Sequence, residues 1–129
     1  MAAKPFLMFQ EGTANEAIQF YTQHLPNSKV VKVEHYPEGD HAGWVKTAVV
    51  EICGLSVMVI DSPIKHQFDF TPSMSLFVTF DSEEAVQEAY SKLSEGAGGI
   101  LMPLDSYDFS KKYAWIKDKF GVSWQLNLE

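Results

Sequence analysis

The sequence is poor in cysteine and in positive charge. It has a single cysteine, Cys53, so no disulfide can form within the chain. Because Gly54 follows it between two apolar strands, we expect Cys53 to be a turn or core residue rather than a nucleophile. Ten Lys side chains, with no Arg, stand against seventeen Asp and Glu, a net charge of −7, and the longest basic run is Lys111-Lys112. With no cluster of cations to neutralise phosphates, we expect neither nucleic acid nor an anionic membrane as a partner.

Long apolar runs and glycine-rich helix starts are missing too. No stretch reaches the length of a signal peptide or a membrane span, and the lone thiol suits a reducing compartment, so we expect a cytoplasmic protein. Gly96, Gly98 and Gly99 follow a predicted helix, whereas a phosphate-binding or adenosylmethionine-binding turn opens one. No Ser-His-Asp or Cys-His spacing stands out. We therefore expect no cofactor.

The sequence does contain enough apolar residues for a core, since 46% of them are hydrophobic and 13% aromatic. The clearest pattern lies in the last predicted strand, 122–128. There Trp124 and Leu126 alternate with Ser123 and Gln125. The apolar face of such a strand rests on a helix, and we expect its polar face to look into solvent or a cavity.

Periodicity and turn residues predict the order strand, helix, strand, strand, strand twice. In the first half we expect strands at 6–10, 28–36, 44–51 and 55–60, and a helix at 13–25. In the second half we expect strands at 74–80, 100–104, 113–117 and 122–128, a helix at 85–93 and a turn at 106–110. Each helix is preceded by capping-box spacing, Thr13 with Glu16 and Asp81 with Glu84.

The two halves also match each other in sequence. The segment Ala17-Ile-Gln19 recurs 68 positions later as Ala85-Val-Gln87, and Gly54-Leu-Ser-Val-Met58 matches Gly121-Val-Ser-Trp-Gln125 at an offset of 67. A common offset predicts a duplicated unit. We therefore expect an α+β fold of two βαβββ modules in one domain, 1–129, with modules at 1–63 and 73–129 and a connector at 64–72. Their sheets are expected to form one curved mixed surface around a cup-shaped pocket.

Several motifs along the chain are those of a known family. They are Phe6-Leu-Met-Phe9, Glu16-Ala-Ile-Gln-Phe-Tyr21, Phe70-Thr-Pro-Ser73, Ser75-Leu-Phe-Val78, Ile100-Leu-Met-Pro-Leu104, Trp115 and Asp118-Lys-Phe-Gly-Val-Ser-Trp-Gln-Leu126. In these the sequence resembles the PhnB-like branch of the vicinal oxygen chelate superfamily, which includes glyoxalase I, bleomycin-resistance proteins and extradiol dioxygenases. Members of the branch often carry the label 3-demethylubiquinone-9 3-methyltransferase. The resemblance implies the paired-module fold and, commonly, a homodimer.

The resemblance also implies where a metal would lie. Enzymes of the superfamily hold a divalent metal with His or Glu at four positions, in the first and last strands of each half. Aligning the helix starts and the Gly-x-Ser repeat carries these positions to Phe6, Met58, Ser75 and Gln125. None of these is a His, Asp, Glu or Cys. Because a divalent cation needs anionic or imidazole ligands, we expect no metal there.

The predicted pocket is lined by residues that face away from the helices. They are Phe6, Met8, Gln10, Ser56, Met58, Ser75, Phe77, Thr79, Trp115, Ser123 and Gln125. His66, in the connector beside Phe68 and Phe70, is a further pocket candidate, with a surface loop position as its alternative. A lining that is mostly apolar and aromatic, with neutral hydrogen-bonding groups, suits a small organic ligand better than an ionised one. Packing of the same residues in the core or a dimer seam is the other reading.

Three functions stay open at this point. The first is a metal-free protein that binds a small molecule. The second is an enzyme, either a lyase or dioxygenase-like member with a displaced metal site at His66 and Asp61, or a methyltransferase as the family label says. The third is a dimeric partner protein, which an exposed apolar patch without an enclosed cavity would favour.

Overall fold

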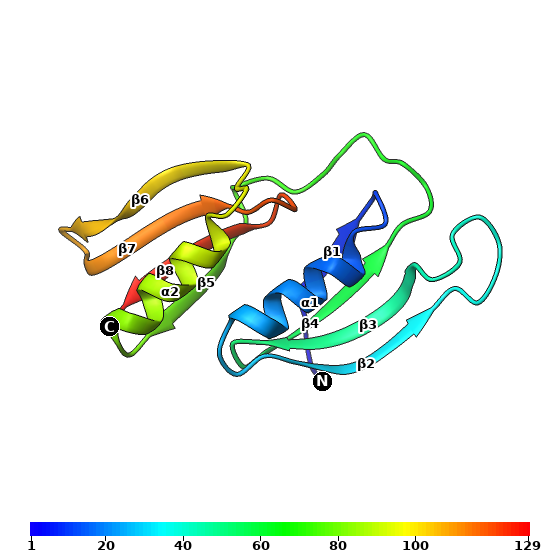
Figure 1. Ribbon diagram of the computed structural model, residues 1–129, viewed down its shortest axis with the longest axis horizontal. Helices are drawn as coiled ribbons and strands as arrows, with labels where there is room; N and C mark the ends of the chain where they lie inside the picture. The colour runs from blue at the N-terminus through cyan, green and yellow to red at the C-terminus, as the bar shows by residue number, and fades with distance from the viewer. The chain divides into compact units, whose positions relative to one another are not determined.

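The computed structural model describes residues 1–129. These residues form two compact units, Met1–Gln67 and Phe68–Glu129. Each unit has the order strand, helix, strand, strand, strand and forms a four-stranded mixed sheet with one helix (Figure 1). The predicted α+β class and the two βαβββ modules are confirmed. The predicted extent of one domain over both modules stays a prediction. No helix is long and apolar enough to cross a membrane.

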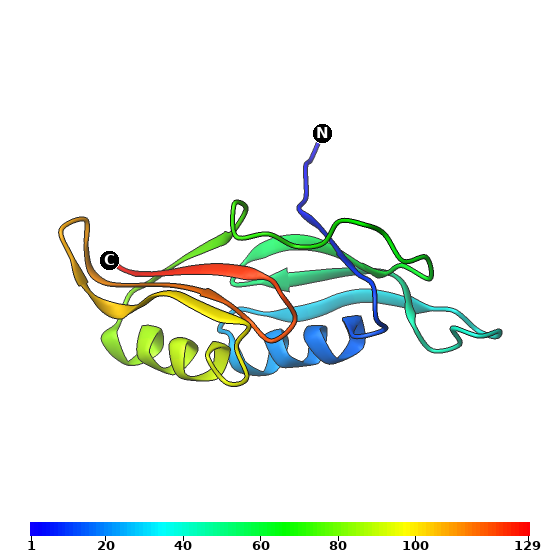
Figure 2. The same ribbon diagram turned by 90° about the horizontal axis from the view of Figure 1, so that it is seen from above.

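The first unit builds its sheet in the order β1-β4-β3-β2. Its elements are β1 (Phe6–Phe9), α1 (Ala14–His24), β2 (Lys29–His35), β3 (Val45–Ile52) and β4 (Leu55–Asp61). β1 is parallel to β4, and the other neighbours are antiparallel. Alternate residues of β3 and β4, among them Val50, Val57 and Val59, are buried together with Ala17 and Tyr21 of α1. The helix covers one face of this sheet and leaves the other uncovered by any element of its own unit (Figure 2).

The second unit repeats this plan in the order β5-β8-β7-β6. Its elements are β5 (Leu76–Phe80), α2 (Glu83–Leu93), β6 (Gly99–Tyr107), β7 (Ser110–Lys117) and β8 (Ser123–Leu128). β5 is parallel to β8, and β8-β7-β6 are antiparallel. Trp124 and Leu126 are fully buried with Val86, Ala89 and Leu93 of α2, as the alternation of the last strand predicted.

The sequence predicts the turn of one hairpin correctly and the turn of another too long. Cys53 and Gly54 form the two-residue loop between β3 and β4, and both have positive φ, 49° and 84°. That combination is the type I′ turn, so the prediction of a turn residue at Cys53 is confirmed. Burial raises the pKa of the Cys53 thiol. The turn predicted at 106–110 is too long: Tyr107 pairs with Ser110, and only two residues are left between β6 and β7.

Both predicted helix caps need correction. The Thr13 side chain makes no capping hydrogen bond; instead the carboxylate of Asp61, at the end of β4, accepts the backbone N–H of Ala14 at 3.0 Å. Thr13 has ψ of 4°, whereas a side-chain cap usually needs an extended residue. In the second unit the cap is Ser82 rather than Asp81. Ser82 has ψ of 150°, and its hydroxyl accepts the N–H of Ala85 at 3.2 Å.

Candidate functional site

The candidate site is the face of the second sheet that points away from α2, here called the open face of the second sheet. It carries the alternate residues of β5, β7 and β8 that lie opposite the buried set. They are Phe77, Thr79, Tyr113, Trp115, Lys117, Ser123, Gln125 and Asn127. The strand register places Gln125 between Phe77 on β5 and Trp115 on β7, as the direct partner of both. The sequence therefore puts a carboxamide between two aromatic side chains.

One end of this face is held by three predicted pocket residues. The Ser123 hydroxyl accepts the indole N–H of Trp115 at 2.9 Å and shares a hydrogen bond of 2.7 Å with the Ser75 hydroxyl. Ser123 itself is only 2% exposed. The structure thus brings Ser75, Ser123 and Trp115 together, and it uses Ser123 to fix the indole ring rather than to face a ligand.

The centre of the face is held by a residue that the sequence did not single out. The Tyr113 hydroxyl donates to Oε1 of Gln125 at 2.5 Å. Tyr113 is 5% exposed, and burial, with a smaller effect from the neighbouring Tyr107, raises the pKa of its hydroxyl. The phenol therefore stays protonated at neutral pH and remains a donor. Strand alternation is the sequence signal that could have found Tyr113, because Tyr113 lies two positions before Trp115 and therefore on the same face.

Aromatic side chains surround this hydrogen bond. The ring of Tyr113 lies 6.5 Å from Phe77 and 4.9 Å from Phe109, between ring centroids. Phe109, at the tip of the β6–β7 hairpin, stacks on Tyr107 at 5.7 Å. Phe77 and Phe109 are 59% and 66% exposed. Large exposed rings next to ordered polar groups are typical of surfaces that bind aromatic compounds.

In the first unit, the predicted pocket residues share the face that points away from α1. Phe6 is the direct partner of Met58, and Met8 is the partner of Ile60, across the parallel pair β1 and β4. Phe6 is exposed, while the other three are half-buried. No hydrogen-bonding side chain lies within this group of four. Ile60 was not among the predicted residues, whereas Ser56 was: it lies two positions before Met58 in β4, half-buried on the same face, and adds one hydroxyl beside these apolar side chains.

His66 is held in the segment that follows β4. Its Nε2 lies 3.2 Å from the Ser62 hydroxyl, and its backbone N–H donates to Oε1 of Gln10 at 2.6 Å. The Ser62 hydroxyl has one proton, and the carbonyl oxygen of Ile64, at 2.9 Å, is its nearer acceptor. His66 Nε2 is then the donor, so this pair is not a serine nucleophile with its base. The contacts instead order the chain around residues 62–66.

The residues do not fit a displaced metal site either. Asp61 is fully buried, and its two oxygens accept the backbone N–H of Ala14 and of Val45, the latter at 2.9 Å. No group of three or more His, Cys, Asp or Glu side chains is placed to hold a metal ion. Asp61 is therefore a buried brace between α1 and β3.

The strand register also changes which residue would stand at one family metal position. Phe6 pairs with Met58, and Gln125, the counterpart of Met58, pairs with Phe77. The counterpart of Phe6 is thus Phe77 and not Ser75, because the offset taken from the helices does not hold for the first strands. Two phenylalanines, a thioether and a carboxamide provide no anionic or imidazole ligand, so the residues at these positions do not fit a divalent metal.

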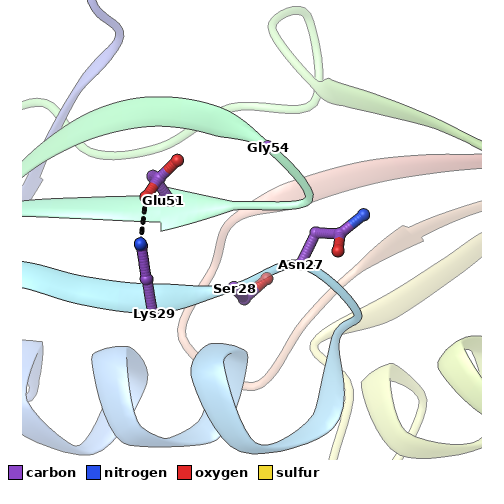
Figure 3. Close-up of a pocket in the computed structure, with 5 residues that line it drawn as sticks. All are labelled: Asn27, Ser28, Lys29, Glu51 and Gly54. Carbon is purple, nitrogen blue, oxygen red and sulfur yellow. Dashed lines mark ion pairs between the residues drawn. The ribbon is translucent and has the colours of Figure 1, made fainter.

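A pocket of about 480 Å³ lies elsewhere, in the first unit, and was not predicted from the sequence. It is lined by Asn27, Ser28, Lys29, Glu51 and Gly54 (Figure 3). The N–H groups of Cys53 and Gly54 bond to Ser28 Oγ and the Asn27 carbonyl, which ties the turn before β2 to the hairpin. The ion pair of 3.5 Å between Lys29 and Glu51 crosses the pocket, and the Lys29 side chain is 74% exposed. Such a pair contributes at most about 1 kcal/mol, and this open polar groove has no buried group to recognise a ligand.

Comparison with known proteins finds a family for nearly the whole chain. A family model described as 3-demethylubiquinone-9 3-methyltransferase matches residues 2–127. A PhnB protein from Bacillus cereus that carries the same methyltransferase name is 44% identical, with a TM-score of 0.94 and complete coverage of both chains. No curated protein matches the chain.

More distant structures share the fold. Protein PA1353 from Pseudomonas aeruginosa is 23% identical, has a TM-score of 0.82, and is matched over 100% of this chain and 98% of its own. The fosfomycin resistance protein FosX from Listeria monocytogenes, solved with Mn(II) and 1S,2S-dihydroxypropylphosphonic acid, is 13% identical with a TM-score of 0.66. The match covers 98% of this chain and 90% of FosX. The fold is therefore that of the glyoxalase and bleomycin-resistance proteins.

Proposed function

The chain belongs to the PhnB-like 3-demethylubiquinone-9 3-methyltransferase family, and from this premise we propose that it binds a small uncharged organic molecule without a metal. The proposed site is the open face of the second sheet, centred on Gln125. The observation that carries this proposal is the surrounding of Gln125 by Phe77, Trp115 and Tyr113, three aromatic side chains of which none is charged at neutral pH. The one charged side chain of this face, Lys117, is the strand partner of Ser123 at the end of the face, so an ionised ligand centred on Gln125 finds no countercharge among its direct neighbours.

The size of the expected effect follows from the surface available. Covering about 200 Å² of apolar surface, counted on ligand and protein together, contributes about 5 kcal/mol. One hydrogen bond adds about 1 kcal/mol. The loss of ligand freedom offsets part of this, so a small bicyclic compound should bind with a dissociation constant of roughly 0.1–1 mM. A larger natural ligand that also reaches Phe109 should bind more tightly.

The test is a screen of neutral aromatic compounds by chemical-shift changes in ¹⁵N-labelled protein. We expect binders to shift the resonances of Trp115 and Gln125, and Phe77→Ala to weaken binding at least fivefold, since it removes one wall of the site. Gln87→Ala, on the exposed side of α2, is the control and should leave binding unchanged. A stoichiometric divalent metal in carefully prepared protein, together with loss of binding on chelation, would overturn the metal-free proposal.

Methyl transfer is the second candidate function, and the names of the family and of the Bacillus cereus protein favour it. The residues of this chain do not fit an adenosylmethionine site of the usual kind. The turn before α1 has one glycine, Gly12, and a Cβ there would lie 2.6 Å from the Trp44 ring, so indole rather than open space fills that position. Mass spectrometry after incubation with 3-demethylubiquinone-9 and adenosylmethionine tests the candidate, and a methylated product would displace our first proposal.

The assembly and location expected from the sequence are part of this proposal. A homodimer is supported by β2, an edge strand whose residues are exposed throughout and include Val30, Val31 and Val33. A cytoplasmic location is supported by the single free thiol of Cys53. Native mass spectrometry of protein taken directly from its host would report oligomer, metal and retained ligand together.

A further inference from the structure

A carboxamide has two orientations of nearly equal shape, and they present opposite chemistry to a ligand. One points the carbonyl oxygen outward as an acceptor, and the other points the NH₂ group outward as a donor. Gln125 lies at the centre of the open face of the second sheet, so its orientation decides which ligands can bond to it.

Resting on the binding function proposed above, we infer that Tyr113 locks the Gln125 carboxamide with its NH₂ group outward. The site would then select planar, uncharged compounds that carry a carbonyl oxygen. The Tyr113 hydroxyl donates to Oε1 of Gln125, and this is the only hydrogen bond that either side chain makes within the protein. The carbonyl oxygen is therefore engaged inside the face, and both N–H groups of the amide are left for a ligand.

The packing of Tyr113 makes the opposite orientation unfavourable. Its ring packs against Phe77, Phe109 and Tyr107, and Oε1 of Gln125 is the one acceptor within hydrogen-bonding distance of its hydroxyl. Reversing the amide would place an N–H donor against the phenol and leave a buried O–H without an acceptor. An unsatisfied buried donor lowers the population of such a state by roughly tenfold to a hundredfold. Because burial raises the pKa of Tyr113, loss of the proton does not relieve this constraint at neutral pH.

A second amide on the same strand does not share this constraint. The Ser110 hydroxyl has one proton and two acceptors within hydrogen-bonding distance, Oδ1 of Asn127 at 2.5 Å and the carbonyl oxygen of Lys112 at 2.7 Å. When the proton goes to Lys112, the Asn127 amide can reverse and donate to Ser110, so the orientation of Asn127 is not fixed. Gln125 therefore provides the one locked donor, and it matches a flat conjugated compound whose carbonyl oxygen accepts a hydrogen bond and whose rings contact Phe77.

Coumarin and indole form a suitable pair of probes, because both are planar bicyclic compounds of similar size. Coumarin offers a carbonyl acceptor and no donor, whereas indole offers one N–H donor and no comparable acceptor. We expect the wild-type protein to bind coumarin at least tenfold more tightly than indole, and coumarin to shift the side-chain NH₂ resonances of Gln125. Binding of indole as tight as that of coumarin would overturn the inference.

Tyr113→Phe is the decisive variant, with Tyr107→Phe as its matched control. Tyr107 belongs to the same aromatic cluster, but its hydroxyl donates to the carbonyl of Pro103 and not to Gln125. Removing the Tyr113 hydroxyl frees the amide to reverse, so the preference for coumarin should fall about tenfold, while Tyr107→Phe should keep it. An unchanged preference in a folded Tyr113→Phe protein contradicts the proposed lock.

A measurement without ligand separates this inference from the proposed function. With Oε1 bonded to Tyr113, the NH₂ protons of Gln125 point away from the tyrosine ring and should show no strong nuclear Overhauser effects to it. Strong effects between these groups would overturn the locked orientation. If coumarin does not bind while other neutral compounds shift the open-face resonances, the inference alone fails. If no compound shifts them, the proposed function fails as well.

Discussion

The carboxylate of Asp118 and the indole of Trp124 are joined by a hydrogen bond of 2.8 Å from Nε1 to Oδ2, and both side chains are buried. The other oxygen of Asp118 accepts the backbone N–H groups of Phe120 and Val122, each at 2.9 Å. One acid thus closes the turn between β7 and β8 and anchors the largest core side chain beneath α2. The stretch with the strongest family resemblance therefore contains a structural brace as well as Gln125, the centre of the proposed site.

Asp118→Asn should destabilise the protein by about 1–3 kcal/mol, because an amide supplies one acceptor oxygen where the turn and the indole together need two. If the amide oxygen of the variant accepts the backbone N–H groups of Phe120 and Val122, the amide NH₂ group faces the indole N–H of Trp124, and two donors meet without an acceptor. Urea unfolding measures the effect. Asp108→Asn, at the exposed tip of the β6–β7 hairpin, is the matched control and should change the free energy of unfolding by less than about 0.5 kcal/mol. Equal losses in the two variants would argue against the brace.

The corrected helix caps give a second pair of variants. Ser82→Ala removes the acceptor for the Ala85 N–H and should cost about 1 kcal/mol. Thr13→Ala should cost less than about 0.5 kcal/mol, because Asp61 and not Thr13 accepts the first free N–H of α1. Thermal unfolding of both variants in the same buffer compares them. A larger loss from Thr13→Ala than from Ser82→Ala would mean that Thr13 caps the helix in solution.

Tyr113 makes the stability of the protein depend on pH in the alkaline range. Its pKa is raised above the ordinary value of 10.0, first by burial and then by Tyr107, so the folded state holds this proton more tightly than the unfolded state. The stabilisation is complete below pH 10 and is lost as the pH rises through the pKa of the folded state. Wild-type protein should therefore lose more stability than Tyr113→Phe between pH 9 and pH 11. Parallel slopes of the free energy of unfolding for the two proteins would contradict the shift.

The helices and strands could be predicted from the sequence because the residue patterns that specify them are local. Alternation in β8 placed Trp124 and Leu126 under α2, and the Cys53-Gly54 pair specified a type I′ turn. The caps could not be predicted in the same way. Asp61 lies 47 positions after Ala14, and only the parallel pairing of β1 with β4 brings it to the start of α1.

The sequence predicted which residues share the face of the candidate site, but not the hydrogen bonds among them. Strand periodicity predicted that Phe77, Trp115 and Gln125 share one side of the sheet, and the register makes them direct partners. The offset between the halves nevertheless misplaced the counterpart of Phe6, because the loops around the helices differ in length. Tyr113 was overlooked although alternation places it on the same face as Trp115, since only the three-dimensional structure shows its hydroxyl bonded to Gln125.

Gln125→Glu tests the absence of metal ligands at the family positions. The substitution adds one carboxylate, but the residues at the other three family positions, Phe6, Met58 and Phe77, offer no anionic or imidazole ligand. A single carboxylate binds Mn²⁺ only weakly, so affinity should rise less than about tenfold and stay in the millimolar range. Isothermal titration of Mn²⁺ into the variant and into wild-type protein measures this, with Gln23→Glu, on the exposed side of α1, showing what an added carboxylate does elsewhere on the surface. Micromolar binding by Gln125→Glu alone would show that other ligands converge on Gln125, and the metal-free site would have to be abandoned.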